Sequence, residues 1–247
     1  MATRAVTLAT LCLLAFTSAS AHETASARAR ASFGAIARRN VLGDEVVIRL
    51  QNATDHSVRM GRTWTITAAA DGSESSVYVW PDGERTVAAG ESRIWMWDQY
   101  THCNGVCQNV SEGEQVPPGR YRVTATVDGV TRTDGFVIGQ YFTLGFDGEP
   151  DVDFEVFVAD PTAYDKMHAD AAAPRDQRDL IVSGIVRGPA SYNPRWSYTM
   201  GPRTIVADEA FTEVCDATPG YVEQHRRAWM GQRWCPWTSY VASEGAR

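Results

Sequence analysis

The chain has 247 residues, of which 44% are hydrophobic and 21% are charged, and its formal net charge is −7. Such a composition is typical of a globular protein with a well-formed core. The acidic balance leaves no basic stripe that could displace counterions from phosphates, which argues against a nucleic-acid partner.

Residues 1–21, MATRAVTLATLCLLAFTSASA, have the parts of a secretory signal peptide. Arg4 supplies the positive start, an apolar run follows from Ala5 to Phe16, and small residues end the segment at Ala21. The run is too short for a permanent membrane span, and no later stretch approaches the roughly 20 apolar residues that a span requires. We therefore expect export to the periplasm or beyond the cell, removal of this leader, and no membrane span.

Residues 22–40 include the Arg-rich run ARARASFGAIARR at 27–39. We predict a flexible leader to the first domain here, in preference to a binding arm.

Residues 41–139 contain short segments that alternate apolar and polar residues between turn signals, which is typical of strands. Trp95 and Trp97 alternate within one such segment, so we expect both on the core face of that strand. The spacing predicts an immunoglobulin-like antiparallel β-sandwich, built from VVIRLQN, WTITAA, SSVYVWP, SRIWMWD, YRVTATVDG and TRTDGFVIG.

The order of these segments is similar to the intracellular proteinase inhibitor family of Bacillus. The similarity covers residues 41–137 and rests on VVIRLQNATDHSVRM, a tryptophan-bearing strand, AAGESRIWMWDQ and VPPGRYRVTATV. It implies an immunoglobulin-like fold and a protease as partner. The chain departs from the pattern by inserting THCNGVCQNVSEGEQ before Pro117. This insertion is either a recognition loop or a surface excursion.

Residues 140–247 predict a smaller α+β domain. Two strands surround the turn DGEP at 147–150, and Asp160-Pro161 is typical of a helix cap and first helical residue. The remaining segments predict a strand in LIVSGIVRG, two strands in PASYNPRWSYTM and PRTIVADEA, one helix in TPGYVEQHRRAWMG and a last strand in TSYVAS.

This second region resembles the N-terminal domain of a slime-mould calmodulin-binding protein and its bacterial relatives. The shared motifs are SGI, YNPxWSY, EVCDA, YVE and CPW, in order. The resemblance implies an exported interaction module and transfers no catalytic residue. Calmodulin binding is not expected, because a target helix needs a basic amphipathic face, and here Arg226 and Arg227 adjoin Glu223.

Four cysteines follow the leader: Cys103, Cys107, Cys215 and Cys235. An even number in an exported chain favours disulfides, and of three connectivities the neighbouring pairs, Cys103–Cys107 and Cys215–Cys235, close the smallest loops. Zinc would require a second Cys or His pair at finger spacing, which is missing. We expect Trp229, Trp234 and Trp237 to pack around the second bridge, and no metal or other cofactor.

A ligand surface, if the second domain has one, is expected at Tyr192, Asn193, Arg195 and Trp196. The segment YNPRW is a proline-bent loop that places hydrogen-bonding and stacking groups together. The alternative is a turn that packs its aromatic rings inward.

No catalytic residue is expected, because none of the five histidines stands in a nucleophile-elbow or HExxH setting. The acidic residues of 147–155 suit either calcium or the solvent side of a strand. The sequence thus predicts a non-catalytic exported protein that binds another extracytoplasmic protein, such as a protease. A carbohydrate- or calcium-binding module and a secreted enzyme of another type are the alternatives.

Overall fold

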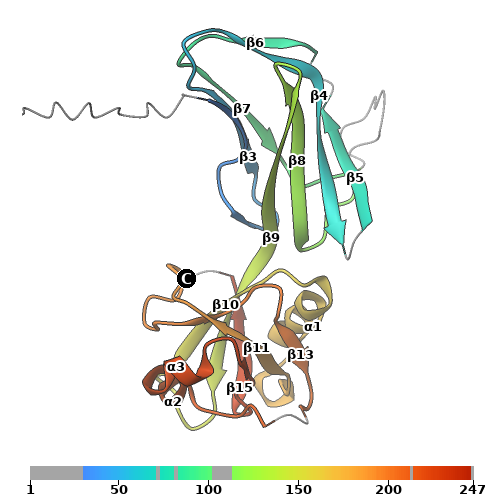
Figure 1. Cartoon of the computed structure of the whole chain (residues 1–247). Coiled ribbons are helices and arrows are strands. Elements are labelled where there is room, and N and C mark those ends of the chain that lie inside the picture. Colours follow the sequence, from blue (N-terminus) through green and yellow to red (C-terminus); the bar gives the residue numbers. More distant parts are fainter. Residues whose placement is uncertain (1–29, 71–72, 81–82, 102–112, 212–213, 246–247) are drawn as a thin grey trace, which may run out of the picture.

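The structure is a computed structural model that describes residues 30–70, 73–80, 83–101, 113–211 and 214–245. The predicted leader 1–21 and the predicted Cys103–Cys107 bridge lie outside these ranges. The fold is mainly β, as predicted: a β-sandwich precedes a smaller α+β region (Figure 1). We call residues 30–139 the first module and residues 140–245 the second module, because each surrounds its own hydrophobic core.

The first module packs two sheets face to face. One sheet has the order β1-β3-β7, and the other includes β9-β8-β4-β5 with β6 beside β4 and β2 beside β9. The strands are β1 (Ala31–Ala35), β2 (Arg39–Val41), β3 (Val46–Asn52), β4 (Val58–Ala70), β5 (Ser73–Trp80), β6 (Arg85–Val87), β7 (Ser92–Trp97), β8 (Gly119–Val127) and β9 (Val130–Phe146).

Alternation along the strands places the apolar side chains between these two sheets. Trp95 and Trp97 are 6% and 1% exposed, which confirms that both face the core. Trp64 is fully buried and stacks on Trp80 with 5.7 Å between ring centroids. Its rings and those of β7 hold the two layers together through apolar burial.

The prediction of a flexible leader is wrong from residue 31 onward. β1 pairs antiparallel with β3, and β2 pairs parallel with β9. Phe33 and Ala35 are buried in the core, whereas Ser32 is exposed. The arginines of this segment suggested a solvent-exposed leader. Its short alternation of apolar residues is, however, typical of a strand at the edge of a sheet.

β9 continues from the first module into the second. Its first part pairs with β8 and its last part pairs with β10 (Asp153–Val158). The predicted domain boundary after Gly139 falls inside this strand. A Cβ atom at Gly139 would lie 2.3 Å from the carbonyl oxygen of Val158, so glycine permits the close crossing at the junction.

The second module also has two sheets, covered by helices (Figure 1). In one sheet β10 and β15 flank the end of β9, and in the other β11 pairs with β12, β13 and β14. The remaining elements are α1 (Pro161–Ala172), the 3-10 helix Arg175–Gln177, β11 (Ile181–Arg187), β12 (Thr199–Met200), β13 (Val206–Asp208), α2 (Pro219–Gln224), α3 (Arg226–Trp229), β14 (Arg233–Trp234) and β15 (Ser239–Glu244).

The helix starts follow the expected capping chemistry. Asp160 accepts a hydrogen bond from the backbone N–H of Ala163 at 2.9 Å, and Pro161 begins α1, as predicted. The single helix predicted over residues 218–231 is instead two short helices, broken at His225 with φ −110° and ψ 23°. Val222 is buried, whereas the neighbouring Tyr221 is 51% exposed.

Candidate functional site

The loop at 192–196 turns two of its four predicted ligand-binding residues inward. Asn193 is 3% exposed and its side-chain oxygen accepts a hydrogen bond from the backbone N–H of Glu155 at 3.3 Å. Trp196 is 8% exposed, donates its indole N–H to the carbonyl oxygen of Asp153 at 2.8 Å, and packs on Phe154. These two side chains hold the loop on β10 and do not form an open stacking surface.

Tyr192 and Arg195 lie nearer the surface of the same loop. The Tyr192 hydroxyl shares a hydrogen bond with the Thr199 hydroxyl at 2.9 Å, and burial raises its pKa. Arg195 is exposed and donates to the carbonyl oxygen of Asp151 at 2.6 Å. The structure brings the four residues together, and a ligand-binding role for them stays a prediction.

The predicted bridge between Cys215 and Cys235 is present, with 5.2 Å between the Cα atoms. It encloses α2 and α3 and lies beside Trp234, which is fully buried and donates its indole N–H to the carbonyl oxygen of Ala217. Trp237 is 51% exposed, so the prediction that it packs around the bridge is wrong. The bridge therefore fixes the return of the chain from the helices to the sheet.

An apolar surface lies on the outer side of β7. Because Trp95 and Trp97 face the core, the alternating Ile94 and Met96 face outward, and they are 53% and 57% exposed. Val47 of β3 stands opposite Met96 in the pairing register and adds a half-buried apolar side chain. We call Val47, Ile94 and Met96 the β7 outer face; its strand leads into residues 102–112.

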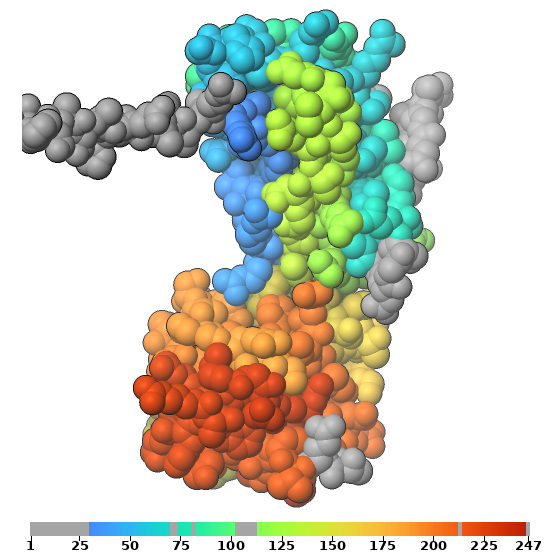
Figure 2. Space-filling model, in the orientation of Figure 1, coloured from blue at the N-terminus to red at the C-terminus, as the bar shows by residue number. Residues whose placement is uncertain are grey.

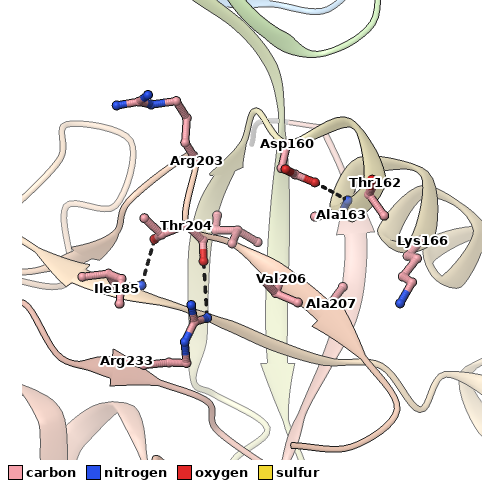
Figure 3. A pocket seen from close by; sticks show the side chains of 11 residues that line it. Asp160, Thr162, Ala163, Lys166, Ile185, Arg203, Thr204, Val206, Ala207 and Arg233 are labelled. Atoms are coloured by element: carbon pink, nitrogen blue, oxygen red, sulfur yellow. Dashed lines mark hydrogen bonds between the residues drawn. The ribbon is translucent and has the colours of Figure 1, made fainter. Parts of the chain in front are cut away.

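A hollow of about 500 Å³ lies between the start of α1 and the chain that leads into β13 (Figure 3). Arg233 on its floor donates to the Ser183 hydroxyl at 2.9 Å and toward the carbonyl oxygen of Thr204 at 3.5 Å. The Thr204 hydroxyl accepts the backbone N–H of Ile185 at 2.9 Å. These bonds fix the floor, whereas Arg203 at the rim extends away from the other side chains in Figure 3.

A second hollow of about 770 Å³ lies where the modules meet. Its first-module wall comes from the ends of β4 and β5 and from residues 117–122, and its second-module wall comes from residues 159–162 and Arg203. The molecule narrows at this level in Figure 2. Asp160, Thr162 and Arg203 line both hollows, so the two adjoin.

The acidic stretch 147–155 does not gather its carboxylates for a cation. Asp147 forms an ion pair with Arg175. Among the described residues, no group of three or more His, Cys, Asp or Glu side chains is placed to hold a metal ion. No helix in the described part of the chain is long and apolar enough to cross a membrane.

The histidines within the described ranges contact neighbouring groups. His168 lies 2.5 Å from a carboxylate oxygen of Glu244, His56 lies 2.9 Å from Asp55, and His225 contacts the carbonyl oxygen of Tyr221 at 2.9 Å. Each contact is to a group on the protein surface.

Comparison with known proteins gives one family. Residues 140–247 match the model of the BP-74 N-terminal domain. This range covers the second module, whose motifs predict a resemblance to the N-terminal domain of a slime-mould calmodulin-binding protein. The resemblance of residues 41–137 to the proteinase inhibitors stays a prediction. No curated protein matches the chain.

Comparison with solved structures gives distant likenesses. The alkylpurine DNA glycosylase AlkC of Pseudomonas fluorescens is 15% identical, with a TM-score of 0.28 over 45% of this chain and 31% of that one. A β-glucosidase of Listeria innocua is 14% identical, with a TM-score of 0.27 over 44% of this chain and 16% of that one. The sporulation control protein Spo0M of Bacillus subtilis is 12% identical, with a TM-score of 0.29 over 69% of this chain and 72% of that one. At such TM-scores these likenesses carry no functional argument.

Proposed function

We propose that this protein is exported and binds another protein outside the cytoplasm without catalysing a reaction. The signal-peptide pattern of residues 1–21 and the Cys215–Cys235 bridge support export, because disulfides persist in oxidising compartments. The match of residues 140–247 to a domain family is compatible with a modular binding protein.

The observation that carries this proposal is the exposure of Ile94 and Met96 on the β7 outer face. Contact of apolar side chains with water is unfavourable, and burial against a partner surface removes this contact, so neighbouring exposed apolar side chains mark interaction sites. Methionine adapts its flexible side chain to different partner surfaces. Both side chains are presented by one regular strand, so the patch needs no rearrangement to bind.

A more specific form of the proposal is that the bound partner is a protease, which this protein inhibits. This form is supported by the resemblance of residues 41–137 to the proteinase inhibitor family and by the position of the β7 outer face directly before the inserted loop. That loop, THCNGVCQNVSEGEQ, lies mostly outside the described residues.

The test is capture from the extracytoplasmic fraction of the producing cell with immobilised residues 22–247, the chain without its predicted leader. Any protease that is retained is then titrated with the free chain. We expect one protein to be retained by the wild type and lost with Ile94→Ser/Met96→Ser. The matched control, Val130→Ser/Met230→Ser, also removes two exposed apolar side chains but leaves the β7 outer face intact.

Retention of the same partner by Ile94→Ser/Met96→Ser would overturn the proposed surface. Stoichiometric inhibition of a captured protease, weakened by substitutions in residues 101–115, would establish the more specific form. If a partner is captured but no protease is slowed, the first module would share the fold of the proteinase inhibitors and not their activity.

A further inference from the structure

The two hollows that share Asp160, Thr162 and Arg203 form one groove across the module junction. We call it the junction groove. It runs from the first-module residues Arg120 and Arg122, past the start of α1, to Arg233 in the second module. Both modules contribute side chains, so the groove exists only when the two are joined as in Figure 1.

The junction groove is basic in an acidic chain of net charge −7. Among its described lining residues, the basic side chains outnumber the acidic Glu74 and Asp160; they are Arg120, Arg122, Lys166, Arg203 and Arg233. A hollow lined by charges of one sign concentrates its field and attracts the opposite charge.

The acidic side chains of the groove already have partners. Glu74 forms an ion pair with Arg122, and Asp160 accepts the backbone N–H of Ala163 as the cap of α1. Arg120 and Arg203 are exposed and make no side-chain hydrogen bond or ion pair within the described ranges. Their charge is therefore available to a ligand, with no internal bond to be broken first.

Lys166 supplies a further cation that can be redirected. Its ammonium nitrogen lies 3.4 Å from a carboxylate oxygen of Asp208, and both side chains are about half exposed. Such a surface pair contributes little free energy in water, so a carboxylate of a ligand can replace Asp208 at small cost.

The arrangement favours an extended ligand over a small anion. The basic groups stand on β8, α1, the chain before β13, and β14, and do not converge on one point. Apolar surface lies between them at Pro117, Pro161 and Val206, and Val206 is 40% exposed. Alternating charged and apolar contacts suit a peptide whose acidic side chains are interspersed with aliphatic ones.

We propose that the junction groove binds an extended acidic segment of a partner protein. This site is separate from the β7 outer face and does not depend on the function proposed above. The segment lies along both modules, its carboxylates pair with Arg120, Arg203 and Lys166, and its aliphatic side chains contact Val206 and the prolines. Binding is electrostatic in large part and weakens as salt is added.

Fluorescence anisotropy with the full-length chain tests this assignment. The probe is a labelled synthetic peptide of alternating Glu and Val, and the control probe replaces every Glu by Gln. We expect Arg120→Glu/Arg203→Glu to raise the Kd for the acidic probe by about tenfold or more, since opposite charges become like charges. Arg120→Lys/Arg203→Lys should stay within a few-fold of the wild type, because it keeps the charge.

The matched control is Arg62→Glu/Arg227→Glu. It makes the same change in net charge, with one exposed arginine in each module and neither in the groove. Equal loss of binding in this control would overturn the proposal, because simple charge attraction would then explain the data. Equal binding of the Gln probe, or tighter groove-dependent binding of polygalacturonate, would also overturn it. The β7 outer face is unchanged in all these variants, so its own test is unaffected.

Discussion

The guanidinium carbon of Arg39 lies 4.8 Å from the ring centroid of Tyr192. Arg39 belongs to β2 of the first module, and Tyr192 belongs to the predicted ligand loop of the second. Tyr141 also packs on this loop, and its ring centroid lies 5.1 Å from that of Tyr192. The loop that the sequence marks as a ligand surface therefore also forms the joint between the modules.

The contact of Arg39 with Tyr192 should be measurable as a coupling free energy. In a double-mutant cycle of Arg39→Ala and Tyr192→Ala, we expect a coupling of about 0.5–1 kcal/mol in the free energy of unfolding, which is typical of an exposed cation–π pair. Urea denaturation of the four proteins gives this value. Purely additive effects would show that the two side chains are near each other without stabilising the joint.

Removal of the Cys215–Cys235 bridge should destabilise the protein. The bridge closes a sequence separation of 20 residues. Loss of its constraint on the unfolded chain should cost about 3 kcal/mol in Cys215→Ala/Cys235→Ala. Guanidinium denaturation measures the change, and Cys103→Ala/Cys107→Ala is the comparison, since the predicted bridge that it removes closes a shorter loop and should cost less. An unchanged midpoint in the first variant would contradict the prediction.

Substitutions of Trp196 and Arg195 should distinguish effects on folding from effects on ligand binding. Trp196→Ala removes a buried ring and leaves the carbonyl oxygen of Asp153 without its indole donor, so we expect a loss of roughly 3–5 kcal/mol in unfolding free energy. Arg195→Ala should cost below about 1 kcal/mol, because Arg195 is exposed. Thermal and urea denaturation check both. Only the Arg195 variant is thus a clean probe of sugar binding at this loop.

Asp170 on α1 should make stability fall with rising pH. Burial raises the pKa of its carboxyl above the ordinary value of 3.8, and one carboxylate oxygen has no hydrogen-bond partner among the described residues. The folded state then holds a proton that the unfolded state has lost, so this group favours folding at acid pH and opposes it as pH rises through the folded pKa.

Asp170→Asn removes this titration. We expect the unfolding free energy of the wild type, minus that of the variant, to decline as the pH rises above the ordinary pKa of 3.8. Urea denaturation at a series of pH values measures the difference. A difference that instead rises with pH would mean that Asp170 is stabilised as a carboxylate.

Local sequence patterns predicted the elements in which buried and exposed residues alternate regularly along the chain. The alternation of VVIRLQN and YRVTATV gave β3 and β8, and Asp160-Pro161 gave the start of α1, because each signal lies within a few residues. The same local reasoning missed β1 and β2, which are short and lie in an arginine-rich stretch of the sequence. It also extended the helix beyond Gln224, since Arg226–Trp229 continue a helical pattern after the break at His225.

The candidate sites depend on contacts between distant residues. The exposure of Ile94 and Met96 could be inferred from the inward direction of Trp95 and Trp97. The junction groove could not be inferred, because Arg120 and Arg203 belong to different modules and approach one space only after folding. The inward turn of Trp196 likewise depends on β10, which lies far from it in the sequence.

The continuity of β9 limits how this chain can be divided. A truncation after Gly139 would keep the pairing of β9 with β8 but would cut β9 before the part that pairs with β10 and β15. A fragment that begins at residue 140 would keep that neighbour but would expose a fresh strand end, and Tyr192 would lose Arg39. An exchange of either module must therefore also supply a strand that pairs with β8 before Gly139 and with β10 and β15 after it.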